Sequence, residues 1–284
     1  MIRSVIQHLR FPFSVLLLPI FLFALSESDS HHSDPTSILL LFFILHLLVY
    51  PSSNAYNSLQ DQDKGSIGLV KNPLPAAKEL KWITILFDLL AILLATTINI
   101  NTAIGVAIYI LFSRLYSYRK IRLKKYLITG FLVVFTFQGF WIYVLTQYVA
   151  NGTLTTESFI YGLCASCLIG AIYPLSQIYQ HKQDKEDGVI SISFLLGYRG
   201  TFIFSGILFI IGTALFSGIH LSKDQINPII IFTLCQLPVI LFFLYWFYQV
   251  WQDPSTADFK QTMRMNVLSA ICMNCCFIIL YFCR

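Results

Sequence analysis

Long apolar runs, separated by short polar segments, dominate this sequence. A helix needs about 20 mostly apolar residues to cross roughly 30 Å of hydrocarbon, and within a bilayer a helix satisfies its own backbone hydrogen bonds. Nine such runs occur, at approximately 11–26, 37–54, 82–99, 102–117, 126–148, 158–179, 196–217, 227–250 and 265–283. The sequence therefore predicts an all-α, polytopic membrane protein. We expect nine transmembrane helices, arranged as two four-helix-like halves plus a last helix, in a single domain over 1–284.

The composition agrees with this fold class. Apolar residues make up 56% of the 284 and charged residues only 12%, whereas soluble domains carry about 25% charged residues. The mean hydropathy is +0.70, which excludes a cytosolic enzyme. Sparse charge together with 25 Phe and 15 Tyr also excludes a disordered chain. We expect membrane lipid as a partner and no nucleic acid.

Basic residues alternate between the two sides of the predicted membrane. Seventeen of the 19 Lys and Arg residues fall on one side, and only Lys223 and Arg284 fall on the other. Because basic residues concentrate in cytoplasmic loops, we predict a multi-pass integral protein of the cell (inner) membrane with a cytoplasmic N-terminus. Residues 1–26 also resemble a secretory signal peptide, so cleavage is an alternative to a first membrane helix kinked at Pro12.

Two polar segments stand out, 54–75 after the second run and 177–197 after the sixth. In the first, Asn57 and Asp61 share one helix face if the second helix continues, and Asp63 lies just beyond. In the second, Gln180 and Asp184 repeat the four-residue spacing, 123 residues after Asn57 and Asp61. Each segment alone is also typical of a solvated charged loop. Their repetition indicates two carboxylate clusters that face one cavity.

The residue types in these segments indicate a particular chemistry. Amide and carboxylate oxygens suit Mg²⁺, which binds through one or two carboxylates together with substrate phosphates. Two facing clusters can hold cations on one diphosphate. The loop 114–125, between the two segments, carries five basic residues from Arg119 to Lys125. Such a loop is suited to a diphosphate, although attraction to anionic lipid explains it equally simply.

Polar residues inside the apolar runs are few. Asp88 is the only carboxylate well inside a run, and such residues face a cavity or a partner. A functional role and a structural hydrogen bond both remain open for Asp88. We expect four other polar residues to make mainly packing contacts between helices: Gln138, Gln236, Asn266 and Asn274.

Taken together, the residues resemble the UbiA superfamily of intramembrane prenyltransferases over essentially the whole chain. That family has nine membrane helices, an NxxxDxxxD motif after helix two and a DxxxD motif after helix six. Asn57 and Asp61 match the first motif, and Asp63 stands where many members carry an additional Asp. Asp184, with Gly188 and the ISFLLG run, is similar to the end of the second motif.

Two positions depart from the family pattern. Gly65 stands where the first motif has its final Asp, and Gln180 stands where the second has its first Asp. Asp63, Glu186 and Asp187 are the neighbouring carboxylates that would have to compensate.

The resemblance implies a Mg²⁺-dependent prenyltransferase that moves an isoprenoid chain from an allylic polyprenyl diphosphate to an acceptor and releases pyrophosphate. The acceptor is not identifiable from the sequence. The resemblance implies Asp61 and Asp184 as catalytic residues, and as metal ligands Asn57, Asp61, Asp63 and Asp184. Tyr116 and Ser117 resemble the family's YS motif, and with them the expected diphosphate-binding residues are Arg119, Lys120, Arg122 and Lys124.

Two other functions are alternatives. A membrane terpene cyclase of the same superfamily would capture the cation within the isoprenoid chain and need no acceptor. A catalytically silent isoprenoid-binding protein would tolerate the two departures. The retained Asn57, Asp61 and Asp184 argue against a silent protein, because ionisable groups near lipid are costly to keep.

Overall fold

The computed structural model describes residues 2–28, 34–62, 65–186 and 188–283. Within them, nine helical segments are long and apolar enough to cross a membrane, which confirms the predicted all-α, polytopic fold. Their bounds are Ile2–Ser26, Pro35–Asp61, Leu80–Ile98, Ile100–Ser117, Leu127–Asn151, Thr156–Gln180, Ile192–Ser222, Asn227–Gln252 and Phe259–Phe282.

Several of these segments are built from shorter helices. The first contains α1 (Ile2–Leu9), η1 (Phe11–Leu16) and α2 (Leu18–Ser26), and the second contains α3 (Pro35–Phe43), the π-helix η2 (Ile44–Val49) and α4 (Tyr50–Asp61). Next come α5 (Leu80–Ile98), α6 (Ile100–Ser117), the short η3 (Leu123–Lys125), α7 (Leu127–Val134), the π-helix η4 (Phe135–Trp141) and α8 (Ile142–Asn151). The remainder comprises α9 (Thr156–Gln177), η5 (Ile178–Gln180), α10 (His181–Glu186), α11 (Ile192–Ser222), α12 (Asn227–Gln252), η6 (Pro254–Thr256) and α13 (Phe259–Phe282).

The breaks follow from local chemistry. Arg10 adopts a left-handed conformation (φ 47°) between α1 and η1, directly before the Phe11–Pro12 pair. The break agrees with the expected kink at Pro12, since proline cannot donate the helical hydrogen bond of its position. Gly197 (φ 66°) bends α11 after its first turns, at a conformation that glycine adopts without strain.

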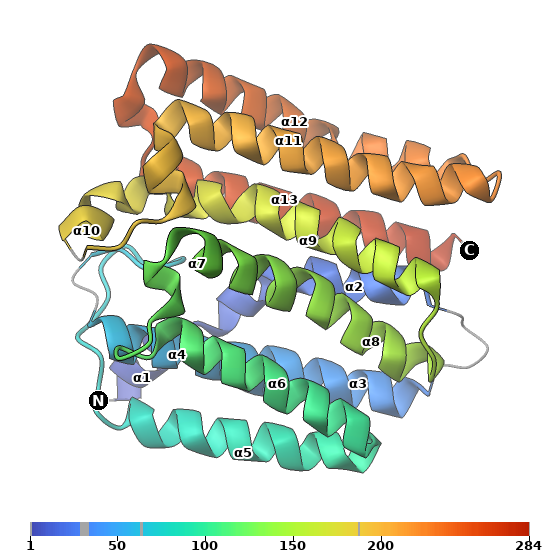
Figure 1. The fold of residues 1–284 in the computed structure, drawn as a ribbon, viewed down its shortest axis with the longest axis horizontal. Helices are drawn as coiled ribbons and strands as arrows, with labels where there is room; N and C mark the ends of the chain where they lie inside the picture. Colours follow the sequence, from blue (N-terminus) through green and yellow to red (C-terminus); the bar gives the residue numbers. More distant parts are fainter. Residues whose placement is uncertain (1, 29–33, 63–64, 187, 284) are drawn as a thin grey trace.

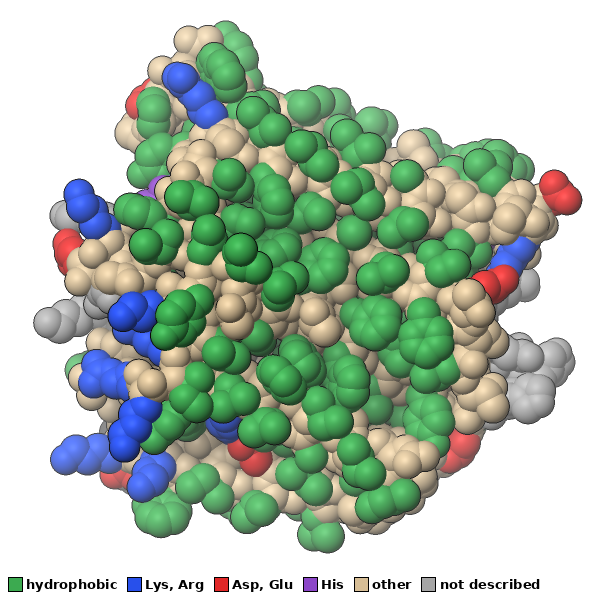
Figure 2. All heavy atoms as spheres, viewed as in Figure 1, with side chains coloured by type: hydrophobic (Ala, Val, Ile, Leu, Met, Phe, Trp, Pro, Cys, Tyr) green, Lys and Arg blue, Asp and Glu red, His purple; other side chains and the backbone are tan. Residues whose placement is uncertain are grey.

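The helices run side by side in one bundle, with the N- and C-termini at opposite ends, as an odd number of crossings requires (Figure 1). The first half packs α4 on α5 and α5 on α6, and the second packs α9 on α11 and α11 on α12. The last helix, α13, packs on both α2 and α12. We call the end of the bundle that holds Asp61 and Gln180 the site end. Lys and Arg side chains gather at this end, on the left of Figure 2.

Apolar side chains occupy both the outside and the core. The outer faces of α5, α11 and α12 expose large apolar residues such as Leu89, Ile210 and Leu241, as expected for helices that face lipid. In the core, the fully buried Phe23 stacks on Phe277 at 4.5 Å and meets Tyr143 at 4.8 Å between ring centroids. Aromatic packing therefore fills the bundle on the side away from the site end.

Gly139 allows η4 and α9 to approach closely. A Cβ atom at this position would lie 2.4 Å from Ser166 Cα, and Ser166 Oγ already donates to the Phe135 carbonyl at 2.6 Å. We therefore expect Gly139→Ala to force the helices apart and to lower the free energy of unfolding by about 1–3 kcal/mol, the usual cost of overpacking. Thermal or SDS-induced unfolding in detergent measures this change.

The matched control is Gly218→Ala in α11, because a Cβ atom at Gly218 meets nothing within 4 Å. Alanine also has a higher helix propensity than glycine, so this variant should be as stable as the wild type or more so. Equal unfolding midpoints for both variants would contradict the proposed role of Gly139.

Candidate functional site

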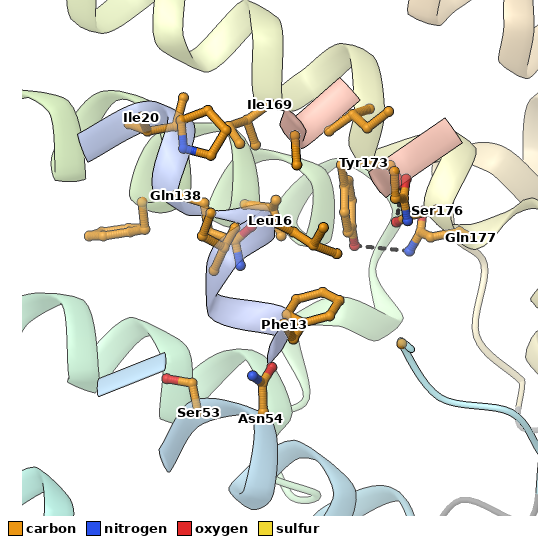
Figure 3. Close-up of a pocket in the computed structure, with 18 of the residues that line it drawn as sticks. Phe13, Leu16, Ile20, Ser53, Asn54, Gln138, Ile169, Tyr173, Ser176 and Gln177 are labelled. Atoms are coloured by element: carbon orange, nitrogen blue, oxygen red, sulfur yellow. Dashed lines mark hydrogen bonds between the residues drawn. The ribbon is translucent and has the colours of Figure 1, made fainter. Parts of the chain in front are cut away.

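A cavity of about 300 Å³ lies between the helices (Figure 3). Near the site end its wall is polar and includes Ser53, Asn54, Asn57 and Gln177. Farther in, apolar side chains take over, and the lining is Leu16, Ile20, Val134, Phe137, Ile169 and Phe277 among others. Along α13 the lining runs from residue 263 to residue 277, which is about 21 Å at 1.5 Å per residue. The cavity thus combines a polar mouth with a long apolar interior.

Asn57 and Asp61 lie one turn apart near the end of α4, as their spacing predicts. The Asn57 Oδ1 atom accepts hydrogen bonds from Ser117 Oγ at 2.8 Å and from Lys124 Nζ at 3.0 Å. Lys124 also forms an ion pair with Asp61, and the Arg122 Nη2 atom lies 3.3 Å from Asp61 Oδ1. The first polar segment and the basic loop therefore meet at one point.

The fold of the basic loop decides which of its cations reach Asp61. After α6 ends, Tyr118 is extended, and its carbonyl accepts from the Arg122 backbone N–H, which closes a tight turn. Arg122 is left-handed (φ 47°), and the Arg119 backbone N–H donates to Gln60 Oε1 on α4 at 3.1 Å. The turn brings Arg122 and Lys124 to Asp61. The side chains of Arg119 and Lys120, which the sequence also suggested as diphosphate partners, are exposed.

A chain of hydroxyl groups joins the two halves of the bundle. Tyr116 Oη and Tyr173 Oη are 2.6 Å apart, and Gln177 Nε2 donates to Tyr173 Oη at 2.9 Å (Figure 3). Tyr116 and Ser117, the predicted YS pair, both line the cavity. Asn57 of the first polar segment and Gln180 of the second also line this cavity, whereas Asp61 and Asp184 are not among its described lining residues. The two polar segments therefore approach the same part of the cavity from opposite halves.

The second polar segment folds into η5 and α10, and its residues are stabilised locally. Ser191 Oγ donates to Asp184 Oδ2 at 2.9 Å, and the Val189 backbone N–H donates to the Asp184 carbonyl at 2.8 Å. Gln180 lines the cavity and donates through Nε2 to Tyr179 Oη at 2.9 Å. Burial lowers the pKa of His181 to about 4. The His181 ring is therefore neutral at pH 7 and adds no positive charge beside Asp184.

The two departures from the family motifs have different structural settings. α4 ends at Asp61, and Gln62 turns the chain through a left-handed conformation (φ 53°). Gly65 therefore does not continue the helical face of Asn57 and Asp61. Gln180 does face the cavity, as a residue at the first position of the second motif should. Two other acidic residues suggested by the sequence, Asp63 and Asp187, lie outside the described residues, and Glu186 is exposed.

The available donors suit a hard cation that also binds substrate. Among the described residues, no cluster of three or more His, Cys, Asp or Glu side chains is arranged to hold a metal by itself. Asn57, Asp61 and Asp184 offer only oxygen atoms, without sulfur or imidazole ligands. Mg²⁺ typically uses one or two protein carboxylates and completes its shell with water and phosphate. The donor set therefore fits Mg²⁺ bound together with a phosphorylated substrate.

Some cavity residues were not expected from the sequence. Arg10 is 8% exposed, lines the cavity and donates from Nη2 to the Asn54 carbonyl at 2.9 Å. In the sequence it could not be distinguished from a basic residue that marks the end of a membrane helix. Gln138 and Asn266 also line the cavity, a position that their expected role as contacts between helices did not include. A single polar residue in an apolar run gives no sign of which way its side chain points.

Buried amide atoms point to a polar ligand in this cavity. Several buried side-chain atoms in the described part of the chain have no hydrogen-bond partner, and three amide atoms are among them: Asn54 Nδ2, Gln177 Oε1 and Asn266 Oδ1. All three residues line the cavity. An unpaired buried polar atom costs about 1–3 kcal/mol, so a ligand or water with complementary groups would stabilise the mouth of the cavity.

Asp88 does not line the cavity, and its carboxylate instead connects neighbouring helices through hydrogen bonds. Its Oδ2 atom accepts from Arg114 Nε at 2.8 Å, and its Oδ1 atom accepts from Ser52 Oγ at 2.7 Å. The Arg114 guanidinium also lies over the Tyr56 ring, 4.2 Å from its centroid. This network ties α4, α5 and α6 together below Asn57.

Comparisons with known proteins agree with this fold. A family model described as the UbiA prenyltransferase family matches residues 16–268. A solved structure of a UbiA homolog from Archaeoglobus fulgidus, bound to DMAPP and Mg²⁺, is 15% identical with a TM-score of 0.70, covering 98% of this chain and 99% of that one. A UbiA homolog from Aeropyrum pernix K1 is also 15% identical, with a TM-score of 0.70 and coverage of 95% and 98%.

A structure described in work on digeranylgeranylglyceryl phosphate synthase is 20% identical, with a TM-score of 0.64 and coverage of 99% of this chain and 97% of that one. At these identities, the likeness shows the fold. A comparison with curated protein sequences gave no significant match.

Proposed function

Because the chain belongs to the UbiA prenyltransferase family, we propose that it transfers an isoprenoid chain from an allylic polyprenyl diphosphate to an acceptor, with Mg²⁺ as cofactor and release of pyrophosphate. The main support is the junction of Asp61, Arg122 and Lys124 beside Asn57, which lines the mouth of a cavity that becomes apolar farther in. Two solved structures of a UbiA homolog from Archaeoglobus fulgidus, bound to DMAPP or GPP together with Mg²⁺, support the same substrate class.

Breaking the bond between the allylic carbon and the diphosphate is the difficult step, because negative charge develops on the leaving group. We assign Mg²⁺ binding to Asn57, Asp61 and Asp184, with Asp63 as a further candidate; the bound ion would neutralise part of that charge. Arg122 and Lys124 supply positive charge at the same place, and Tyr116 and Ser117 supply hydroxyl donors on the cavity wall. Preorganised charge of this kind lowers the barrier to departure.

The apolar interior suits the isoprenoid chain. It excludes water, which would otherwise capture the allylic cation before the acceptor does. Tyr109, Phe137 and Phe277 line this part of the cavity. The faces of aromatic rings stabilise a nearby cation through their quadrupole. The deep part of the cavity can therefore bind the chain and protect the reactive carbon.

We also propose that the site end faces the cytoplasm, in the cell (inner) membrane. Seventeen of the 19 basic residues fall on the side of the site end in the predicted topology, and basic loops remain in the cytoplasm. In this orientation, Asp61 and Asp184 have access to soluble diphosphates and to Mg²⁺.

The test of the reaction uses purified protein with Mg²⁺ and allylic diphosphates of several chain lengths. Pyrophosphate release is followed first without an acceptor and then with a broad panel of aromatic and phosphate-bearing acceptors. A transferase should release pyrophosphate mainly with the right acceptor, because capture of the cation requires a positioned nucleophile. Hydrocarbon or alcohol products without an acceptor would identify a cyclase instead. Binding without either reaction would overturn the proposed activity.

A further inference from the structure

A second hollow lies on the outside of the bundle, between α12 and the start of α13. This groove has a volume of about 1,030 Å³ and is distinct from the central cavity in most of its lining. Along α13 it runs from Asp258 to Ile271, about 20 Å at 1.5 Å per residue. A bilayer with its headgroups is roughly 40 Å thick, so the groove has the length of one leaflet.

The polarity of the groove changes along this length. Its charged residues, Lys260 and Arg264, lie in the first two turns of α13, close to the site end, and Lys71 joins them from the 65–79 segment. The part farther from the site end is apolar and includes Phe242, Val267 and Ile271. A membrane lipid has the same order of groups, with a polar head at the surface and an acyl chain below it.

The charge at the mouth of the groove selects the type of head group. The groove is lined by three basic residues, Lys71, Lys260 and Arg264, and by one acidic residue, Asp258. The Asp258 carboxylate caps α13 by accepting from the Gln261 backbone N–H at 2.8 Å. Lys71 and Lys260 are exposed, and no ion pair in the described chain involves them. Among the described residues, the Arg264 side chain donates only to the neutral Gln261 side chain, at 3.1 Å. The mouth therefore carries positive charge that an anionic head group would neutralise.

A tight turn holds Lys71 beside the groove. Ile67 and Val70 form a backbone bridge, Ser66 Oγ donates to the Lys71 carbonyl at 2.7 Å, and the Leu69 N–H contacts Met263 Sδ at 3.3 Å. Met263 lines both the groove and the central cavity. Met263 is therefore the lining residue that the groove and the central cavity share among the described residues.

From these observations we infer that the groove between α12 and α13 binds an anionic phospholipid, with its head group at Lys71, Lys260 and Arg264 and an acyl chain along the apolar part. Nothing in the inference depends on the proposed transfer reaction. Annular lipid around a membrane protein does not discriminate strongly between head groups, whereas this groove combines a defined shape with a local excess of positive charge.

Native mass spectrometry tests the inference. The full-length protein is equilibrated with equal amounts of phosphatidylglycerol and phosphatidylcholine, and the lipid retained by the protein is counted. We expect the wild type to retain phosphatidylglycerol preferentially. The double variant Lys260→Gln/Arg264→Gln should lose about 30-fold in that preference, since each juxtamembrane cation contributes a factor of about five. Val267→Trp, which fills the apolar part and leaves the cations in place, should also lower retention.

The matched control is Lys78→Gln/Lys125→Gln, which removes the same charge from exposed residues at the site end that do not line the groove. This control should lose less of the preference than the groove variant, because its two cations do not meet at one groove. All variants should unfold at the wild-type temperature. Equal retention of the two lipids by the wild type would overturn the inference, as would equal losses in the groove and control variants or no effect of Val267→Trp. A dimer that dissociates in the groove variant would show that a second copy covers the groove instead.

Discussion

Replacing Asp61 by asparagine is expected to reduce turnover by two or more orders of magnitude, the scale on which loss of a key electrostatic group acts. The carboxylate is a proposed metal ligand, and it also holds Arg122 and Lys124 at the mouth of the cavity. Asparagine preserves the shape but removes the charge that both roles require. Asp184→Asn should have an effect of the same order, because Asp184 belongs to the equivalent segment of the other half. The initial rate of pyrophosphate release at saturating Mg²⁺ measures both.

Asp34→Asn provides the control for these variants. Asp34 caps α3 by accepting from two backbone N–H groups and lies between the first two spans, at the opposite end of the bundle from Asp61. Asparagine is also a good helix cap, so the control should retain wild-type turnover. Wild-type rates in both Asp61→Asn and Asp184→Asn would show that the site is assigned to the wrong residues.

Asp88→Asn should have the largest effect on stability. It leaves the Arg114 guanidinium, 18% exposed, without its carboxylate partner inside the bundle. Breaking a buried ion pair by removing one partner costs about 3–5 kcal/mol, and partial exposure of this pair brings the expected loss to about 2–4 kcal/mol. SDS titration of the purified protein measures the free energy of unfolding. Asp88→Asn/Arg114→Met should recover part of the loss, because the uncompensated charge is then removed as well.

An exposed ion pair at the opposite end of the bundle is the comparison. Glu157 and Lys223 are 49% and 33% exposed and pair at 2.5 Å. Because solvent screens such pairs, Glu157→Gln should cost less than about 1 kcal/mol. A loss in Asp88→Asn no greater than in Glu157→Gln would mean that the network around Arg114 does not tie α4, α5 and α6 together.

The nine long apolar helices of the described residues follow from the sequence, because a bilayer requires long apolar runs and leaves few other structures for them. The ends of helices were harder to predict. The last helix begins at Phe259 rather than near 265, and the first segment starts at Ile2 but is interrupted at Arg10. These boundaries depend on caps and on one left-handed residue, and neither changes hydropathy.

The candidate site was predictable only in part, for a similar reason. The four-residue spacing places Asn57 and Asp61 on one face, and the structure has them so. Spacing does not show that the turn after α6 directs Arg122 and Lys124 inward while Arg119 and Lys120 stay exposed. Spacing also does not predict that Arg10 lines the cavity. Its position and its hydrogen bond to Asn54 depend on packing between the first span and α4.

Asp61 pairs with Arg122 and Lys124, so these side chains act as counter-ions for one another. A metal ion that takes the carboxylate leaves two positive side chains uncompensated, and a diphosphate that takes these cations leaves a carboxylate uncompensated. Each ligand supplies the charge that the other requires, so on the proposed assignment they favour each other's binding. By reciprocal linkage, Mg²⁺ and diphosphate then raise each other's affinity by the same factor. In the resting site Asp61 offsets one of the two positive charges of Arg122 and Lys124, and on the proposed assignment both ligands replace these pairings together.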